Sequence, residues 1–159
     1  MNYFDIRKAK SPTTKRAFAW QGEAYQPPHE NFYSTDAFTD FAIDCVEKHE
    51  NPEQPFFLYL AYNAPHWPLH APPEDIARYR GRYMDGWPDV RKKRYRRLVE
   101  LGLIKADWTL SEQDSEATDW DSLPEEKKRE MDLKMAVYAA QIDRMDQGVG
   151  RVMETLRRK

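Results

Sequence analysis

The segment Ala64-Pro65-His66-Trp67-Pro68-Leu69-His70 contains the side chain best suited to chemistry in this sequence, the imidazole of His66. Near neutral pH an imidazole can donate a proton to a leaving oxygen or hydrogen-bond to an anion. The prolines on either side of His66 restrict the backbone, so the ring is expected to be held in place. His66 is therefore the candidate catalytic and substrate-binding residue. A loop histidine with a structural hydrogen bond is the alternative interpretation.

The other histidines and the cysteine are weaker candidates for a catalytic or metal-binding role than His66. His70 lies four residues after His66, but the intervening proline forbids the helix that would place both rings on one face for a metal ion. His29 and His49 have no supporting context. Cys45 stands alone, so neither an internal disulfide nor a multi-cysteine metal site can form. Its place on an apolar helical stripe predicts a small buried hydrophobic side chain.

Residues 91–97, Arg-Lys-Lys-Arg-Tyr-Arg-Arg, form a dense basic run. Such a run could bind phosphates or act as a localisation signal. Many acidic residues follow between positions 107 and 126, which favours a solvated helix face paired with acids. We therefore expect no nucleic-acid partner. No apolar run approaches the ~20 residues that span a bilayer, so no membrane partner is expected either.

The elements around His66 suggest an α/β fold. Residues 55–62, Pro-Phe-Phe-Leu-Tyr-Leu-Ala-Tyr, predict a strand buried on both faces, and His66 would follow its carboxyl end, where ligands bind in open α/β sheets. No second run of this quality exists in the chain. Because a buried strand needs neighbours for its backbone N–H and C=O groups, the remaining strands are expected to come from elsewhere.

The rest of the chain is predicted to be helical or irregular. A helix is expected from Asp36, with Thr35 as N-cap, to about Asn51. Short helices are expected at about 73–79 and 89–101, and loops at 1–35 and 106–123. Apolar residues at four- and three-residue spacing predict one long helix over about 124–158. We favour a helix packed on a sheet, and a coiled coil is the alternative.

The composition agrees with part of a larger domain. The chain has 159 residues, a net charge of −2, 33% charged and 40% hydrophobic residues, and a mean hydropathy of −0.93. Soluble domains usually contain about 45–50% apolar residues, so this chain is poor in core-forming side chains. Its first residues show no signal-peptide pattern. Cytoplasmic and periplasmic locations both stay open.

Several segments resemble the middle of bacterial type I arylsulfatases, members of the alkaline-phosphatase-like superfamily. The resemblance is strongest over residues 55–72, and it continues in Tyr79-Arg80-Gly81-Arg82-Tyr83 with Gly86-Trp87. Residues 135–146, Met-Ala-Val-Tyr-Ala-Ala-Gln-Ile-Asp-Arg-Met-Asp, are similar to the long helix of this family. The resemblance implies that residues 1–159 form an internal part of one α/β sulfatase catalytic domain.

The resemblance also implies a chemistry and shows what this sequence lacks. Sulfatases hydrolyse sulfate esters with a formylglycine made in a Cys/Ser-x-Pro-x-Arg motif, and a calcium ion binds that nucleophile and the sulfate. The histidine that matches His66 contacts the sulfate and helps to protonate the leaving alcohol. Cys45 does not lie in the modification motif, and the paired metal aspartates and the Asp-Asn-Gly motif are absent. We therefore expect no calcium ligand in this chain and no activity from it alone.

Three hypotheses follow. The first is an internal fragment of an arylsulfatase that acts on a small-molecule sulfate ester once the missing portions of the domain are present. The second is a phosphonate or phosphodiester hydrolase of the same superfamily. The third is a non-catalytic helical interaction module that uses the helix at 124–158.

Overall fold

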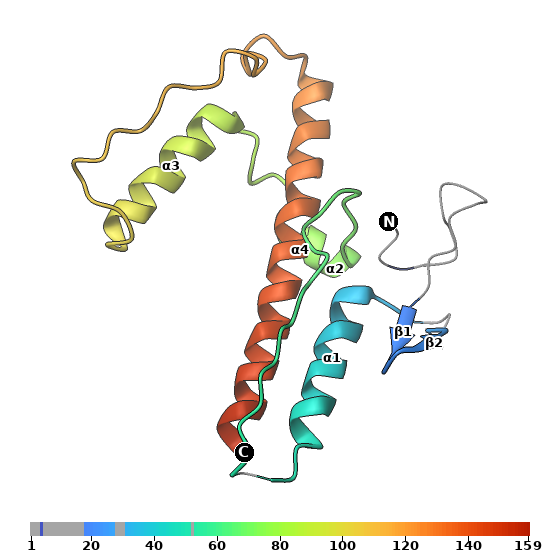
Figure 1. The fold of residues 1–159 in the computed structure, drawn as a ribbon. Helices are drawn as coiled ribbons and strands as arrows, with labels where there is room; N and C mark the ends of the chain where they lie inside the picture. The colour runs from blue at the N-terminus through green and yellow to red at the C-terminus, as the bar shows by residue number, and fades with distance from the viewer. Residues whose placement is uncertain (1–3, 5–17, 28–30, 52) are drawn as a thin grey trace. The chain divides into compact units, whose positions relative to one another are not determined.

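A computed structural model describes residues 4, 18–27, 31–51 and 53–159 (Figure 1). The chain divides into two compact units, Met1–Ile76 with Val137–Lys159, and Ala77–Ala136. The elements are, in chain order, β1 (Phe18–Trp20), β2 (Glu23–Tyr25), α1 (Ser34–Glu47), α2 (Pro73–Ala77), α3 (Gly86–Glu100) and α4 (Glu125–Arg158). The protein is thus rich in helix, and α4 contributes to both units.

Strands β1 and β2 form a two-stranded antiparallel hairpin, with Phe18 opposite Tyr25 and Trp20 opposite Glu23. Its two-residue turn, Gln21-Gly22, has φ values of 51° and 87°. Two successive positive φ angles match the twist of a tight hairpin, and glycine adopts them without a steric cost. Residues 18–25 therefore form a hairpin inside the region that we predicted as a loop, residues 1–35. The prediction for residues 1–3, 5–17 and 28–30 lies outside the described residues.

The buried strand predicted at residues 55–62 is wrong. Within the described ranges, this segment pairs with no strand, and the side chains of Phe57 and Tyr59 are 91% and 80% exposed. The side chains nevertheless alternate as they do in an extended chain: Leu58 and Leu60 face α4, while Phe57 and Tyr59 face outwards. The apolar composition is that of a central strand, but the ladder that would bury its outer face is not formed here.

Helix α1 begins at Ser34, two residues before the predicted start, and its N-cap is Tyr33 instead of Thr35. Its buried face consists of Thr35, Thr39, Ala42 and Val46, which recur at helical spacing. Cys45 lies beside this face and is exposed, so its predicted burial is wrong. The buried face of α1 is thus partly polar, because Thr35 and Thr39 are buried together with Ala42 and Val46.

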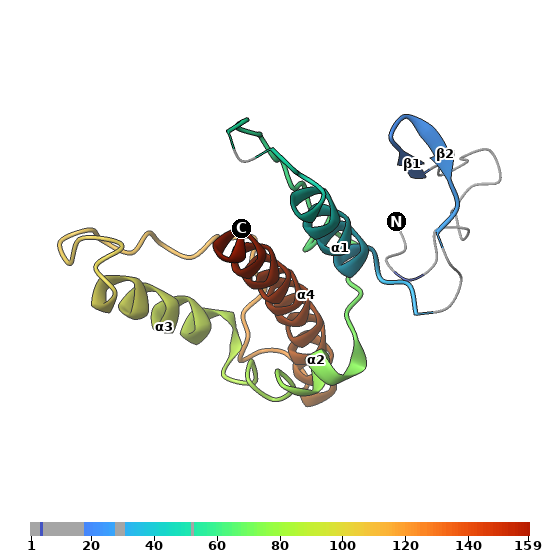
Figure 2. The ribbon, with the colours of Figure 1, turned by 90° about the horizontal axis from the view of Figure 1, so that it is seen from below.

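Helix α4 spans Glu125–Arg158, which confirms the predicted long helix. Its C-terminal half runs beside α1 in the same direction (Figures 1 and 2). Three arginine–acid pairs join the two helices along their length: Arg144–Asp36, Arg151–Asp40 and Arg158–Glu47. In the described part of the chain, α4 lies against a helix and an extended segment, and the sheet that we expected beneath it is missing. Among the described helices, none is long and apolar enough to cross a membrane.

The unit Ala77–Ala136 contains α3, the following loop and the first turns of α4. Buried Asp132 on α4 accepts hydrogen bonds from the backbone N–H groups of Gly81 and Tyr83, at 2.8 and 2.9 Å. The rings of Trp87 and Trp120 meet edge to face at 4.8 Å between centroids. The first contact connects the segment before α3 to α4, and the second connects the end of the irregular loop predicted at 106–123 to α3. The short helices predicted near 73–79 and 89–101 are confirmed as α2 and α3, although α3 starts three residues early.

Candidate functional site

The loop that carries His66, residues 63–72, connects the extended segment to α2. Its ends are buried at Ala64 and at Ala71-Pro72, whereas its middle is exposed. Cis peptide bonds precede Pro65 and Pro68. The proline-rich sequence therefore produces the non-helical loop that we predicted, and that loop presents His66 on the surface.

Three side-chain contacts hold this loop. The hydroxyl of Tyr62, just before the loop, lies 2.7 Å from Thr39 Oγ1 on α1. Tyr33 at the N-cap of α1 donates a hydrogen bond of 2.9 Å to the carbonyl oxygen of His70. Asp75, just after the loop, lies 3.7 Å from the guanidinium of Arg144. The loop is thus fixed before, within and after the segment that contains His66.

The His66 side chain is exposed, and two hydrogen bonds connect the residue to its own loop. Its backbone N–H donates to the carbonyl oxygen of Asn63 at 2.9 Å, which closes a turn. Its Nδ1 lies 2.5 Å from the carbonyl oxygen of Trp67. A carbonyl oxygen can only accept, so this hydrogen bond places a proton on Nδ1. Nε2 is then the ring nitrogen that can accept a proton in the neutral ring and donate it in the cation.

An arginine between two aspartates lies behind the loop. Arg144 on α4 donates two hydrogen bonds to Asp36, from Nε at 2.8 Å and from Nη2 at 2.7 Å, and it lies near Asp75, whose side chain is 0% exposed. The hydrogen bonds that Arg144 donates to Asp36 raise the pKa of Arg144 further above its already high ordinary value. Sequence analysis missed this cluster because Asp36 and Arg144 are 108 residues apart, and no local pattern marks them as partners.

The other described histidines, His49 and His70, have contacts of their own. His70 is half-buried, its ring centroid lies 6.1 Å from that of Phe4, and burial lowers the pKa of its imidazole. His49 Nε2 lies 2.8 Å from the carbonyl oxygen of Gln54, which gives it a local structural role. His29 lies outside the described residues. Within the described residues, His49 and His70 thus contact Gln54 and Phe4, respectively.

The basic run lies on α3, where four of its six basic side chains have contacts in the structure. Lys92 and Lys93 pair with Asp89 and Asp85, and Arg97 pairs with Glu100. Arg91 donates to the carbonyl oxygens of Ser111 and Glu112 in the following loop. These basic side chains thus pair with acids on or next to the same helix rather than with the acidic residues between 107 and 126, and Arg91 contacts the following loop through Ser111 and the Glu112 carbonyl oxygen.

Calcium requires a different arrangement from the one observed. A calcium ion takes six to eight oxygen ligands, and carboxylates supply most of them in proteins. Within the described ranges, no three His, Cys, Asp or Glu side chains gather in a group that could hold a metal ion. The carboxylates of Asp36 and Asp75 face an arginine, whose positive charge would repel a cation. These residues do not fit a calcium site.

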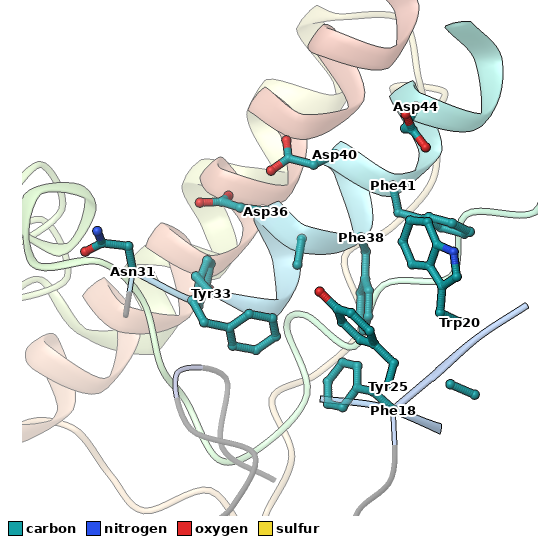
Figure 3. A pocket seen from close by; sticks show the side chains of 13 residues that line it. Phe18, Trp20, Tyr25, Asn31, Tyr33, Asp36, Phe38, Asp40, Phe41 and Asp44 are labelled. Atoms are coloured by element: carbon teal, nitrogen blue, oxygen red, sulfur yellow. The ribbon is translucent and has the colours of Figure 1, made fainter. Parts of the chain in front are cut away.

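A separate cavity of about 400 Å³ lies between the hairpin and α1. Figure 3 shows Phe18, Trp20 and Tyr25 from the hairpin opposite Phe38 and Phe41 from α1. Its acidic neighbours Asp36, Asp40 and Asp44 are paired with Arg144, Arg151 and Lys48. The cavity is therefore an aromatic packing space with neutralised acids at its edge, and His66 does not line it.

Comparison with known proteins places these observations in a family. The Sulfatase family model matches residues 3–159. The chain is 42% identical over 130 residues to an uncharacterized sulfatase of Schizosaccharomyces pombe, which covers 80% of the chain and 23% of the yeast protein. It is 38% identical over 136 residues to an arylsulfatase of Klebsiella aerogenes, which covers 86% of the chain and 29% of that protein.

A shorter match is also to a sulfatase. Over 43 residues, 27% of the chain and 8% of the relative, it is 51% identical to an uncharacterized sulfatase of Escherichia coli. The chain spans less than a third of the length of these relatives. The family resemblance stated from residues 55–72 and 135–146 is confirmed by a match that covers nearly all of the sequence. This protein belongs to the sulfatase family.

Proposed function

We propose that this chain forms part of a sulfate ester hydrolase in which His66 hydrogen-bonds to the sulfate group and protonates the leaving alcohol. The observation that carries the proposal is the anchored loop: it presents the His66 ring to solvent while Nδ1 is committed to the Trp67 carbonyl oxygen. Membership of the sulfatase family supports the substrate class, and the Klebsiella relative is named an arylsulfatase.

The proposed proton transfer follows from the state of the ring. When the imidazole is protonated, both ring nitrogens carry a hydrogen, and Nδ1–H keeps its hydrogen bond to the carbonyl oxygen of Trp67. Nε2–H then donates its proton to the ester oxygen as the S–O bond to the alcohol breaks and sulfur is transferred to a nucleophile supplied from outside these residues. The product leaves as a neutral alcohol.

The nucleophile and the metal would come from outside these residues. The Cys/Ser-x-Pro-x-Arg motif does not occur in the 159 residues, and the described carboxylates do not form a calcium site. In the family, a formylglycine supplies the nucleophile and a calcium ion stabilises negative charge on the sulfate. We therefore expect the 159-residue chain to lack turnover by itself, with His66 acting only within a more complete domain.

The test uses the longest polypeptide that the gene encodes around these residues, with His66→Ala and His66→Gln compared against the unchanged protein. Aryl sulfates with leaving phenols of increasing pKa are assayed under saturating conditions. A general acid typically contributes about 10²–10⁴-fold to the rate. We expect the loss of kcat in His66→Ala to grow as the leaving phenol becomes more basic, because a poor leaving group needs the proton most.

His70→Gln is the matched control, since it removes an imidazole from the same loop. It should leave the dependence on the leaving group unchanged. A uniform loss in His66→Ala across all phenols would argue for a structural role of the ring. Flanking sequence without either a Cys/Ser-x-Pro-x-Arg or an Asp-Asn-Gly motif would contradict the hydrolase proposal. Preference for an aryl phosphonate over an aryl sulfate would favour the alternative chemistry of the same superfamily.

A further inference from the structure

The unit Ala77–Ala136 contains a cavity of about 260 Å³ that the sulfatase proposal does not use. It opens between α3, the end of the following loop and the first turns of α4. This volume is slightly below the range of about 300–1,000 Å³ that is typical of small-molecule sites, so a small ligand would suit it. The lining residues used in the argument are Trp87, Arg91, Arg94, Trp120, Met131 and Met135.

The walls of the cavity are apolar and in part rigid. Trp120 is only 5% exposed and packs edge to face on Trp87. Trp120 also passes so close to Gly86 that a Cβ atom at that position would lie 2.3 Å from its ring. Met131 and Met135 form the opposite wall from α4. Two aromatic rings and two adaptable methionines make a slot that can accept a flat ring.

The charge around the cavity has one sign. Arg91 and Arg94 line it, and no aspartate or glutamate does. Arg91 is held in position because it donates to the side chain of Ser111 at 2.7 Å and to the carbonyl oxygen of Glu112 at 3.1 Å. Arg94 forms no hydrogen bond or ion pair with any residue that the structure describes. An anionic group would thus find one fixed and one available guanidinium.

A buried donor adds a third observation. The indole N–H of Trp87 is buried and has no hydrogen-bond partner within the described part of the chain. A buried N–H without an acceptor is unfavourable, and indole can only donate. Because Trp87 lines the cavity, a ligand whose binding shifts this ring and brings an acceptor to its N–H would satisfy the group. The Trp87 side chain, which forms part of an apolar wall, therefore also offers a hydrogen-bond donor to a ligand acceptor.

We propose that this cavity binds a small aromatic anion, with its ring between the tryptophans and the methionines and its anionic group on Arg94 and Arg91. The apolar walls exclude a bare inorganic anion as the best ligand, and the two guanidinium groups exclude a cation. The proposal rests on residues of the unit Ala77–Ala136 alone. This proposal can therefore be tested independently of the role of His66.

The probe is 2-naphthalenesulfonate, a flat aromatic anion without an ester bond that a sulfatase could cleave. Its binding to the 159-residue chain is measured by isothermal titration calorimetry at low and high salt. The neutral analogue 2-naphthalenemethanol, which has the same ring system, is titrated in parallel. We expect saturable binding of one sulfonate per chain, weaker binding at high salt, and at least about tenfold weaker binding of the alcohol, since it lacks the charge-assisted hydrogen bonds.

Three variants locate the site. Arg94→Gln should weaken binding about tenfold or more, because it removes the available guanidinium. Arg96→Gln is its matched control: it lowers the net charge equally on an exposed position of the same helix but does not line the cavity. Trp87→Phe keeps an aromatic wall and removes the N–H, so it should weaken binding by a smaller factor. His66→Ala should bind the probe as the unchanged chain does.

Several results would overturn the proposal. No saturable binding at millimolar probe would do so, as would equal affinity for the alcohol. Equal weakening by Arg96→Gln and Arg94→Gln would show a diffuse charge effect on α3 instead of a site. Loss of probe binding in His66→Ala would assign the sulfonate to the loop at residues 63–72, which would support the hydrolase proposal and reject this one. A circular dichroism spectrum of each variant, equal to that of the unchanged chain, confirms that folding is retained.

Discussion

Arg144 in α4 and Asp36 in the first turn of α1 form a two-point ion pair, with Nε and Nη2 donating to the two carboxylate oxygens at 2.8 and 2.7 Å. Both side chains are less than one-third exposed. The pair joins segments 108 residues apart, and the same guanidinium lies beside buried Asp75 at the start of α2. A single arginine thus connects both helices to the end of the loop that carries His66.

Arg144→Met is expected to lower the free energy of unfolding by about 2–3 kcal/mol, because it leaves two carboxylates, one of them buried, without their counter-charge. Urea denaturation checks this value. Arg144→Lys should recover only part of the loss, since an ammonium cannot make the two-point contact. Arg151→Met is the control: its pair with Asp40 is at least half exposed and should contribute below about 1 kcal/mol. Equal losses at the two positions would contradict this ranking.

The glycines of α4 should respond oppositely to alanine. At Gly148 a Cβ atom would lie 2.5 Å from Thr39 Oγ1 and 2.9 Å from the Tyr62 hydroxyl, so Gly148→Ala must push α1 and the extended segment away from α4. At Gly150 nothing lies within 4 Å. Gly150→Ala should stabilise the chain by about 0.5–1 kcal/mol through helix propensity, whereas Gly148→Ala should destabilise it. Thermal melts of both variants test this prediction: the Tm should rise in Gly150→Ala and fall in Gly148→Ala, and shifts of the same sign would contradict it.

The alternation in the segment at residues 55–62 can be tested with neighbouring substitutions. Phe57→Ser changes a side chain that is 91% exposed, so it should leave the free energy of unfolding within about 0.5 kcal/mol and raise the concentration at which the chain aggregates. Leu58→Ser removes a side chain that faces Val149 and Val152 on α4, and it should cost about 1–3 kcal/mol. Equal destabilisation would mean that both faces of the segment are covered in solution.

Stability should fall on mild acidification because of His70. Burial lowers the pKa of its imidazole below its ordinary value of 6.5, so the folded state favours the neutral ring. As the pH drops below about 6.5, the unfolded chain binds a proton that the folded chain resists, and the free energy of unfolding decreases. Above that pH the contribution of His70 is fully present. His70→Gln should flatten this part of the stability profile, and an unchanged slope between pH 7.5 and 5 would contradict the assignment.

The local patterns of the sequence were sufficient for the helices. The apolar spacing over 124–158 and the acidic residues at its start correspond closely to α4, since helical hydrogen bonds are made within one segment. The prolines around His66 likewise predicted a non-helical loop, and the residues of that loop carried part of the family resemblance. Where structure depends on neighbours in the chain, sequence was a reliable guide.

Tertiary structure decided the features that depend on distant partners. Residues 55–62 have the composition of a buried strand, but a strand is defined by ladder bonds to another segment, and within the described ranges none is present, so Phe57 and Tyr59 are exposed. The cluster of Asp36, Asp75 and Arg144 and the cavity beside Trp87 also combine residues that are far apart in the sequence. Periodicity records which face of an element is apolar, whereas only the folded chain determines which residues meet that face.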